Sequence, residues 1–174
     1  KGKKQYRDLE LARKRAAGIK HKVVENLDSY LGNFETNFEK NGGKVIWAQT
    51  VDDAISGVVN VLKKHEVRLV VKSKSMITEE LDLNPALEKE NIESVETDLG
   101  EYIVQVADEK PYHIVTPAMH KSKEDIAGLF HEKFNTDKDS SPEELTVFVR
   151  DKLREKFLHA DAGITGANFL IADT

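Results

Sequence analysis

Apolar residues recur at three- and four-residue steps through the first forty positions. They are Leu9, Ala12, Ala16, Ile19, Val23, Leu27, Leu31, Phe34 and Phe38. This spacing puts them on one stripe of a helix, so the sequence predicts a single long helix from about residue 3 to about residue 40. Asn41-Gly42-Gly43 ends it. We therefore expect an N-terminal helical extension over residues 1–43 and a second domain over residues 44–174.

From residue 44 onward, short apolar runs alternate with amphipathic segments. The predicted strands are 44–48, 67–72, 93–97, 113–116 and 169–172. The predicted helices are 51–65, 78–91 with a second short helix from Pro85, 99–107, 123–134 and 143–158, and 161–168 is predicted as a Gly-rich turn. Repeated strand-helix-strand units need right-handed crossovers and build a parallel sheet covered on both faces. The predicted fold class is therefore α/β, with an open, mainly parallel sheet.

Three of these helices carry start signals in the sequence. Thr50 caps the helix at 51–65, with Asp53 at its third position. Ser141 has a capping-box partner at Glu144. Pro142 occupies the first helical position behind Ser141, and Ser122 precedes the helix at 123–134.

The chain is acidic overall but begins with a basic segment. Its 26 basic and 31 acidic side chains give a formal charge of −5, so a nucleic-acid backbone is not an expected partner. Residues 1–25 hold nine Lys and Arg against three Asp and Glu. This segment is either a solvated helix face or a docking arm for an acidic partner, and the sequence does not choose between them.

Cysteine is absent, which excludes disulfides, thiolate nucleophiles and iron–sulfur ligation by thiolate within these residues. The longest apolar runs, at 45–48 and 169–172, are far too short to cross a bilayer. No signal-peptide pattern precedes them. We expect a soluble, cytoplasmic protein.

Two segments that follow predicted strands could bind a ligand, because ligands of open parallel sheets bind at the carboxyl ends of the strands. The first is Lys72, Ser73, Lys74 and Ser75, which offers two ammonium groups and two hydroxyls to a phosphate or carboxylate. The alternative is that a serine caps the next helix and the lysines are solvated.

The second segment contains Gly163, Thr165, Gly166 and Asn168. Glycines three residues apart let the backbone approach a ligand closely, and the two polar side chains could contact it. The spacing and position differ from a dinucleotide fingerprint, and the chain has no P-loop. A tight structural turn explains the segment equally well.

The six histidines show no metal-binding spacing, so no metal site is predicted. His120 follows the predicted strand at 113–116 and could face the same crevice. Glu101 similarly follows a strand and could pair with a histidine in acid-base chemistry. Helix capping by Asp98 and packing of Tyr102 explain that stretch without chemistry, and no nucleophile elbow accompanies it.

Four ordered blocks resemble the amino-terminal domain of the lactate-utilisation iron-sulfur protein B family, a domain type shared with the companion protein C. They are Val-Lys-Ser-Lys-Ser-Met-Ile-Thr-Glu-Glu at 71–80, Leu-Asn-Pro-Ala-Leu-Glu at 83–88, Glu-Thr-Asp-Leu-Gly-Glu-Tyr-Ile at 96–103, and Ala-Asp-Ala-Gly-Ile-Thr-Gly-Ala-Asn-Phe-Leu-Ile-Ala-Asp-Thr at 160–174. The resemblance covers nearly the whole chain, and the leading helix with Ala-Arg-Lys-Arg is also typical of the family.

The resemblance implies a fold similar to the ribose-5-phosphate isomerase, glucosamine-6-phosphate deaminase and CoA-transferase group. It implies a cytosolic complex that oxidises L-lactate to pyruvate, with companion lactate-utilisation subunits as partners. Protein B of this family carries two [4Fe-4S] clusters on cysteines downstream of this domain. Because the family's pattern continues past residue 174, we expect the chain to be a fragment that holds no cofactor itself.

Two functions follow as hypotheses. The first is the non-cluster domain of an electron-transfer subunit. The second is a domain that binds or transforms a small carboxylate or phosphorylated metabolite through the residues at 72–75 and 163–168. The resemblance supplies no catalytic residues, and no complete catalytic set is present in the sequence.

Overall fold

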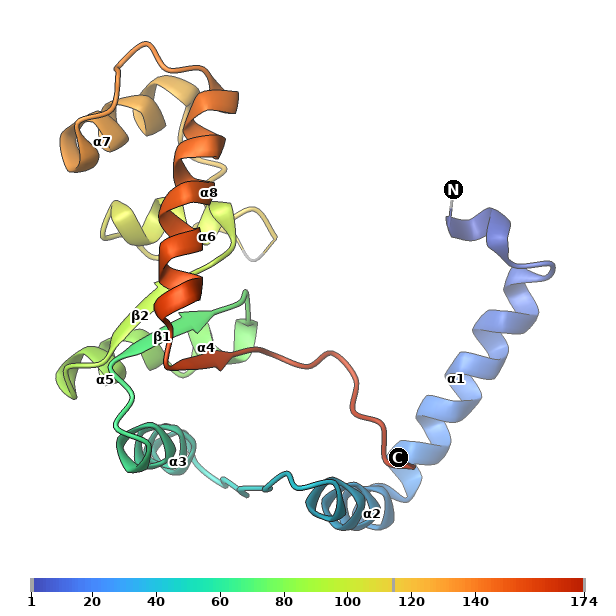
Figure 1. Ribbon diagram of the computed structural model, residues 1–174. Coiled ribbons are helices and arrows are strands. Elements are labelled where there is room, and N and C mark those ends of the chain that lie inside the picture. The colour runs from blue at the N-terminus through green and yellow to red at the C-terminus, as the bar shows by residue number, and fades with distance from the viewer. Residues whose placement is uncertain (1, 114, 174) are drawn as a thin grey trace. The chain divides into compact units, whose positions relative to one another are not determined.

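The computed structural model describes residues 2–113 and 115–173 (Figure 1). The chain forms two compact units. One combines the residues up to Trp47 with those from Ala167 onward, and the other runs from Ala48 to Gly166. None of the helices in the described residues is both long and apolar enough to cross a bilayer.

A parallel three-stranded sheet organises the second unit. It consists of β1 (Leu69–Lys72), β2 (Glu93–Glu96) and β3 (Ala162–Ile164), in the spatial order β2-β1-β3. Both pairings of β1 are parallel, with Val70 opposite Ser94 on one side and Ala162 on the other. The predicted α/β class with an open parallel sheet is confirmed.

Helices connect the strands and cover both faces of the sheet. They are α3 (Val51–Lys64), α4 (Met76–Glu80), α5 (Leu83–Lys89), α6 (Leu99–Val106), α7 (Lys123–Phe134) and α8 (Pro142–His159). The capping box expected at Ser141 is present, and the caps expected at Thr50 and Ser122 form capping boxes with Asp53 and Asp125. These boxes satisfy backbone N–H groups that would otherwise lack partners at the helix starts.

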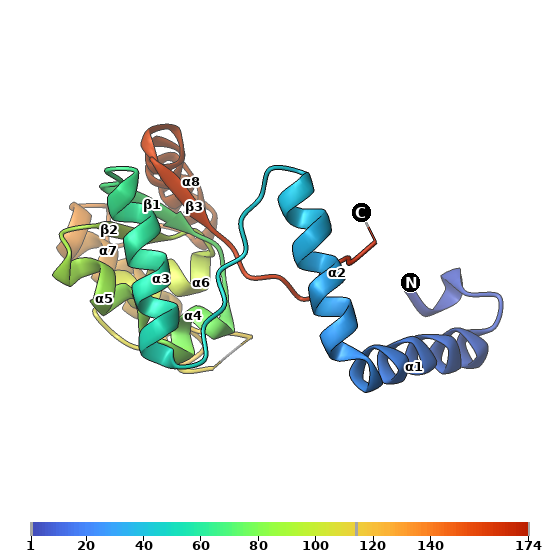
Figure 2. The same cartoon turned by 90° about the horizontal axis from the view of Figure 1, so that it is seen from below.

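Two hydrophobic clusters form the core, one on each face. Val95 packs with Phe130 and Val149 from α7 and α8, whereas Val70 packs with Leu62 and with leucines of α5. Val71 pairs with Val95 in register, so Val70 and Val95 point to opposite faces. α6, α7 and α8 accordingly lie above the strands in Figure 1, and α3 lies in front of them when seen from below in Figure 2.

The turn predicted at 161–168 is wrong in part, because residues 162–164 form strand β3. The Asp161 carboxylate accepts hydrogen bonds from the backbone N–H groups of Arg68 and Leu69, at 2.8 and 2.9 Å. At the other end, the Ser73 N–H donates to the Ile164 carbonyl. Pairing with β1 at both ends therefore overrides the turn preference of the glycines.

The first unit contains the 3-10 helix η1 (Gly2–Gln5), α1 (Leu9–Glu25) and α2 (Leu27–Lys40). The predicted continuous helix is therefore wrong. Asn26 leaves helical geometry at φ −131° and ψ 36°, and its side chain donates to the Lys22 carbonyl. Asparagine forms such local bonds in competition with the helix.

The predicted strands at 44–48 and 169–172 are also wrong, since neither segment pairs with a strand. Side chains of the same unit hold both segments instead. The Trp47 indole donates to Glu35, and Asn37 donates to the Ala172 carbonyl. An apolar run becomes a strand only where a ladder partner lies beside it. The predicted strand at 113–116 includes residue 114, which lies outside the described residues.

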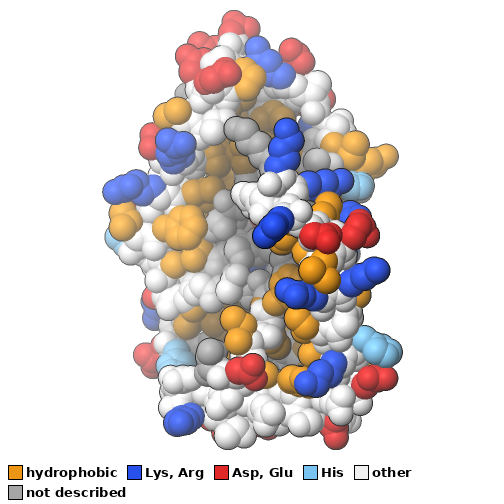
Figure 3. Space-filling view, turned by 90° about the vertical axis from the view of Figure 1, so that its right-hand side faces the viewer, with side chains coloured by type: hydrophobic (Ala, Val, Ile, Leu, Met, Phe, Trp, Pro, Cys, Tyr) orange, Lys and Arg blue, Asp and Glu red, His pale blue; other side chains and the backbone are white. Residues whose placement is uncertain are grey.

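The apolar stripe of α1 and α2 is not buried in a hydrophobic core. No described residue of α1 or α2 is buried, and Ile19, Val24 and Leu27 are exposed. Phe34 stacks on Phe38 at 5.2 Å between ring centroids. Figure 3 shows Lys and Arg side chains among exposed hydrophobic ones on one face of the molecule. Exposed apolar residues rimmed by charges are typical of interaction surfaces.

Candidate functional site

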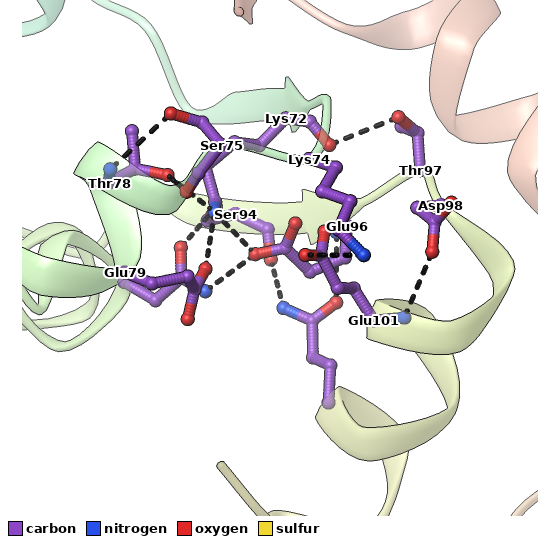
Figure 4. Close-up of polar contacts among 12 residues, drawn as sticks. Lys72, Lys74, Ser75, Thr78, Glu79, Ser94, Glu96, Thr97, Asp98 and Glu101 are labelled. Atoms are coloured by element: carbon purple, nitrogen blue, oxygen red, sulfur yellow. Dashed lines mark hydrogen bonds and ion pairs between the residues drawn. The ribbon is translucent and has the colours of Figure 1, made fainter. Parts of the chain in front are cut away.

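Lys72, the last residue of β1, lies at the centre of a buried ionic network (Figure 4). Its side chain has no exposed surface, and its Nζ lies 2.7 Å from Glu96 Oε1 and 2.9 Å from Glu79 Oε1. The same Nζ donates to the Thr78 hydroxyl at 3.0 Å. Burial alone would lower the pKa of Lys72, but the two carboxylates outweigh it and raise that pKa, so the ammonium stays charged.

Glu96 is held in place by amide side chains. Asn84 of α5 donates to Glu96 Oε1 at 2.9 Å, and Ser94 donates to the Asn84 side-chain carbonyl. Gln105 of α6 accepts from the Glu96 N–H and donates to the Ser94 carbonyl. These bonds fix the Glu96 carboxylate, yet its second oxygen, Oε2, is buried and without a hydrogen-bond partner among the described residues.

Glu101 is the second buried carboxyl of the site. It lies in the first turn of α6, where the Asp98 side chain accepts the N–H groups of Gly100 and Glu101. Glu101 is 4% exposed, its Oε2 has no described partner, and Lys74 Nζ lies 3.9 Å from its Oε1. Burial, with the nearby charge of Glu96, raises the pKa of Glu101 to about 7.

A cavity of about 630 Å³ adjoins these carboxyls. Its lining comes from α4, α5 and the residue Asp82 between them, from the end of β2, and from α6 and the segment after it. Glu79, Glu96 and Glu101 contribute to it, as do Asn84 and Gln105. No group of three or more His, Asp or Glu among the described residues could hold a metal ion. The volume lies within the range of small-molecule sites.

The two predicted ligand-binding segments meet at the carboxyl ends of β1 and β3. The Ser73 hydroxyl donates to that of Thr165 at 3.0 Å. Ser75 caps α4, and a Cβ on Gly166 would lie 2.7 Å from the Ser75 Oγ, so only glycine fits there without movement. Gly163 lies within β3 opposite Val71.

The remaining predicted residues are placed differently. Lys72 points into the network described above, whereas Lys74 is partly exposed and donates to the Val115 carbonyl. His120 pairs with Glu109 at 2.7 Å rather than with Glu101. Asn168 belongs to the first unit.

Sequence reasoning missed Glu79, Glu96, Asn84 and Gln105. The register of the parallel strands could have revealed Glu96, because Lys72 and Glu96 end neighbouring strands as a direct pair. A lysine and a glutamate at the ends of two buried strands indicate a buried ion pair when the strands are adjacent.

These features define an open α/β domain with an ionic network and a cavity beside the carboxyl ends of its strands. The chain matches the family model of the LUD domain over residues 31–174 and belongs to that family. The family resemblance drawn from the sequence motifs is confirmed.

Curated relatives extend the comparison. The chain is 52% identical over 157 residues to lactate utilization protein B of Bacillus subtilis, covering 90% of this chain and 33% of that protein. It is 49% identical over 168 residues to lactate utilization protein B of Lysinibacillus sphaericus, covering 96% of this chain and 35% of that protein. An uncharacterized electron transport protein of Escherichia coli, YkgF, is 44% identical over 162 residues, or 93% of this chain and 34% of that protein.

The chain thus spans about a third of the length of these relatives. No solved structure matches it. The [4Fe-4S] clusters implied by the resemblance do not fit the residues present, because the chain contains no cysteine to supply thiolate ligands.

Proposed function

We propose that this chain is the non-cluster domain of an iron-sulfur electron-transfer subunit in a cytoplasmic complex that oxidises L-lactate to pyruvate. The proposal is carried by 52% identity over 90% of the chain to lactate utilization protein B. The similarity to an electron transport protein supports the same role. The proposed fold relatives are the ribose-5-phosphate isomerase, glucosamine-6-phosphate deaminase and CoA-transferase group.

In this proposal the clusters are held by cysteines outside these residues, and companion lactate-utilisation subunits dock on the complex. α1 supports a docking role, because it exposes Arg13, Lys14 and Arg15 beside apolar residues and is not buried by its own unit. A helix that exposes apolar and basic side chains together can bind a partner surface that is acidic and partly apolar.

The full reading frame that encodes this chain provides the test. We expect about eight irons per chain, the number in two [4Fe-4S] clusters, after anaerobic expression. Affinity-tagged protein should also retain the companion subunits. The 174-residue chain alone is the matched control and should carry no iron, since it lacks cysteine. An iron-free full-length protein, or one that retains no companion subunit, would contradict the proposal.

Two contacts favour a second function, the binding of a small anion. Ser73 donates a hydrogen bond to Thr165, and Ser75 packs against Gly166. This edge would bind the carboxylate or phosphate of a small metabolite, with the partly exposed Lys74 as the cation. The same edge could serve a transferase-like or isomerase-like reaction. It could also serve lactate recognition within the electron-transfer subunit.

Calorimetry of the full-length protein with lactate, pyruvate, a sugar phosphate and CoA tests this second function. Lys74→Ala should weaken binding of the anion about tenfold, because a hydrogen bond to a charged group contributes about 1.5–3 kcal/mol. Lys138→Ala, which removes an exposed lysine of the loop after α7, should leave binding unchanged. Equal affinities in wild type and Lys74→Ala would exclude this edge as the anion site.

A further inference from the structure

We propose that the groove between α8 and the start of α6 binds an acidic amphipathic helix of a protein partner. The groove lies wholly in the second unit, so it is distinct from α1. The inference does not depend on the proposed electron-transfer role. The groove has a volume of about 530 Å³, with α8 as one wall and Thr97 and Leu99 as the other (Figure 1).

The floor of the groove is apolar and incompletely covered. Val149, Leu153 and Phe157 lie at four-residue steps, so they form one row along α8. Val149 and Leu153 are buried, whereas Phe157 is 56% exposed. Leu99 on the opposite wall is 39% exposed. Exposed apolar side chains that line a hollow favour a partner with an apolar face of its own.

The rim of the groove is a second row on α8, and it is basic. The row consists of Thr146, Arg150, Arg154 and Leu158, again at four-residue steps, and all four side chains are exposed. Neither arginine forms an ion pair with another described residue, and no acidic side chain lines the groove. Two cations without acidic partners beside an apolar floor complement a partner that is apolar and acidic.

The spacing of the two arginines favours a helix as that partner. Arg150 and Arg154 are about one helical turn apart, or about 6 Å along the axis. Acidic side chains at four-residue steps on a second helix have the same spacing, so a helix that lies along α8 would pair with both arginines. Such pairs of guanidinium and carboxylate groups form strong bidentate hydrogen bonds. They would also offset the repulsion between two like charges four residues apart.

The length of the groove favours a helix over a small molecule. Its lining extends along α8 from Thr146 to Leu158, which is about 18 Å of helix axis. The apolar face of a partner helix would contact the inner row, and its acidic flank would reach the rim, as in other complexes that hold a helix in a groove. A small monocarboxylate would pair with one arginine and leave the other without a partner.

Two synthetic helical peptides of about 18 residues test the proposal on the full-length protein. Both carry leucine along one face. The flank beside that face carries glutamate at four-residue steps in one peptide and lysine in the other. Fluorescence anisotropy at physiological ionic strength measures their binding. We expect the glutamate peptide to bind and the lysine peptide not to bind, because both charges on the rim are positive.

Reversing both rim charges should reverse this preference. Arg150→Glu combined with Arg154→Glu should weaken binding of the glutamate peptide at least about tenfold and create binding of the lysine peptide. A gain of binding does not arise from misfolding. Lys64→Glu combined with Lys89→Glu makes the same change in net charge at exposed lysines of α3 and α5, on the opposite face of the sheet. This control should leave both affinities unchanged.

The apolar floor has a separate test. Phe157→Gln should weaken binding of the glutamate peptide about tenfold, because the peptide would bury the exposed part of this ring. Val61→Gln is the matched control, since Val61 is 41% exposed and lies on α3. It should leave the affinity unchanged.

Five results would overturn the proposal. Three concern the peptides: no binding of the glutamate peptide, equal affinity for both peptides, and equal effects of the two double substitutions. The fourth is displacement of the glutamate peptide by decanoate, which would assign the groove to small carboxylates. The fifth is a full-length dimer, measured by light scattering, that Arg150→Glu with Arg154→Glu converts to monomer. That result would assign the groove to a second copy of this chain.

Discussion

Replacing Lys72 by methionine should lower the free energy of unfolding by about 3–5 kcal/mol, the usual effect of removing one partner from a buried ion pair. The ammonium has no exposed surface and contacts two carboxylates within 2.9 Å. Methionine fills similar space but leaves Glu96 buried without its cation. Urea unfolding of the 174-residue chain, followed by circular dichroism, measures the loss.

A matched substitution separates this effect from the general loss of a lysine. Lys63 pairs with Glu90 at 2.6 Å, but their side chains are 56% and 38% exposed. Lys63→Met should therefore change stability by at most about 1 kcal/mol. Adding Glu96→Gln to Lys72→Met should restore part of the lost stability, because it removes the uncompensated charge. Equal effects of the two lysine substitutions would show that the Lys72 network contributes no special stability.

The sequence predicted those parts of the fold that depend on local signals. Thr50, Ser122 and Ser141 mark helix starts because their side chains satisfy backbone groups a few residues away. The strand at Leu69–Lys72 was predictable because buried parallel strands have apolar sequences, and three of its four residues are apolar. The strand at Glu93–Glu96 was also predicted, although Val95 is its one apolar residue. Such signals require no knowledge of distant residues.

Features that depend on distant residues were not predictable. β3 forms because Asp161 bonds to the backbone at Arg68 and Leu69, more than ninety positions away. Conversely, residues 44–48 and 169–172 have the composition of strands but no ladder partner. The break between α1 and α2 at Asn26 is local. It was not predicted because the spacing of apolar residues continues unchanged on both sides of Asn26.

The candidate site likewise combines residues that the sequence identified with contacts that it did not predict. The segment at 72–75 was found because ligands bind at the carboxyl ends of parallel strands, and the segment at 163–166 was found from its two glycines three residues apart. The orientation of Lys72 was not predictable from the segment alone, since its two carboxylates come from β2 and α4. Glu101 was selected for its position after a strand, but its unpartnered oxygen is visible only in three dimensions.

Glu101→Gln should stabilise the chain at alkaline pH and not at acidic pH. The pKa of Glu101 rises from 4.5 to about 7 on folding, with burial as the main cause. The folded chain therefore holds this proton more tightly than the unfolded chain. The resulting stability is present below about pH 4.5 and is lost as the pH rises to about 7. A shift of this size corresponds to about 3 kcal/mol.

Glutamine keeps the shape of the protonated carboxyl and does not titrate, so it isolates this effect from the other carboxyls. The difference in unfolding free energy between Glu101→Gln and wild type should grow by about 3 kcal/mol between about pH 4 and about pH 8. Urea unfolding at both pH values measures it, with Glu132→Gln as the exposed control. A difference that stays constant with pH would show that Glu101 is ionised normally in the folded chain.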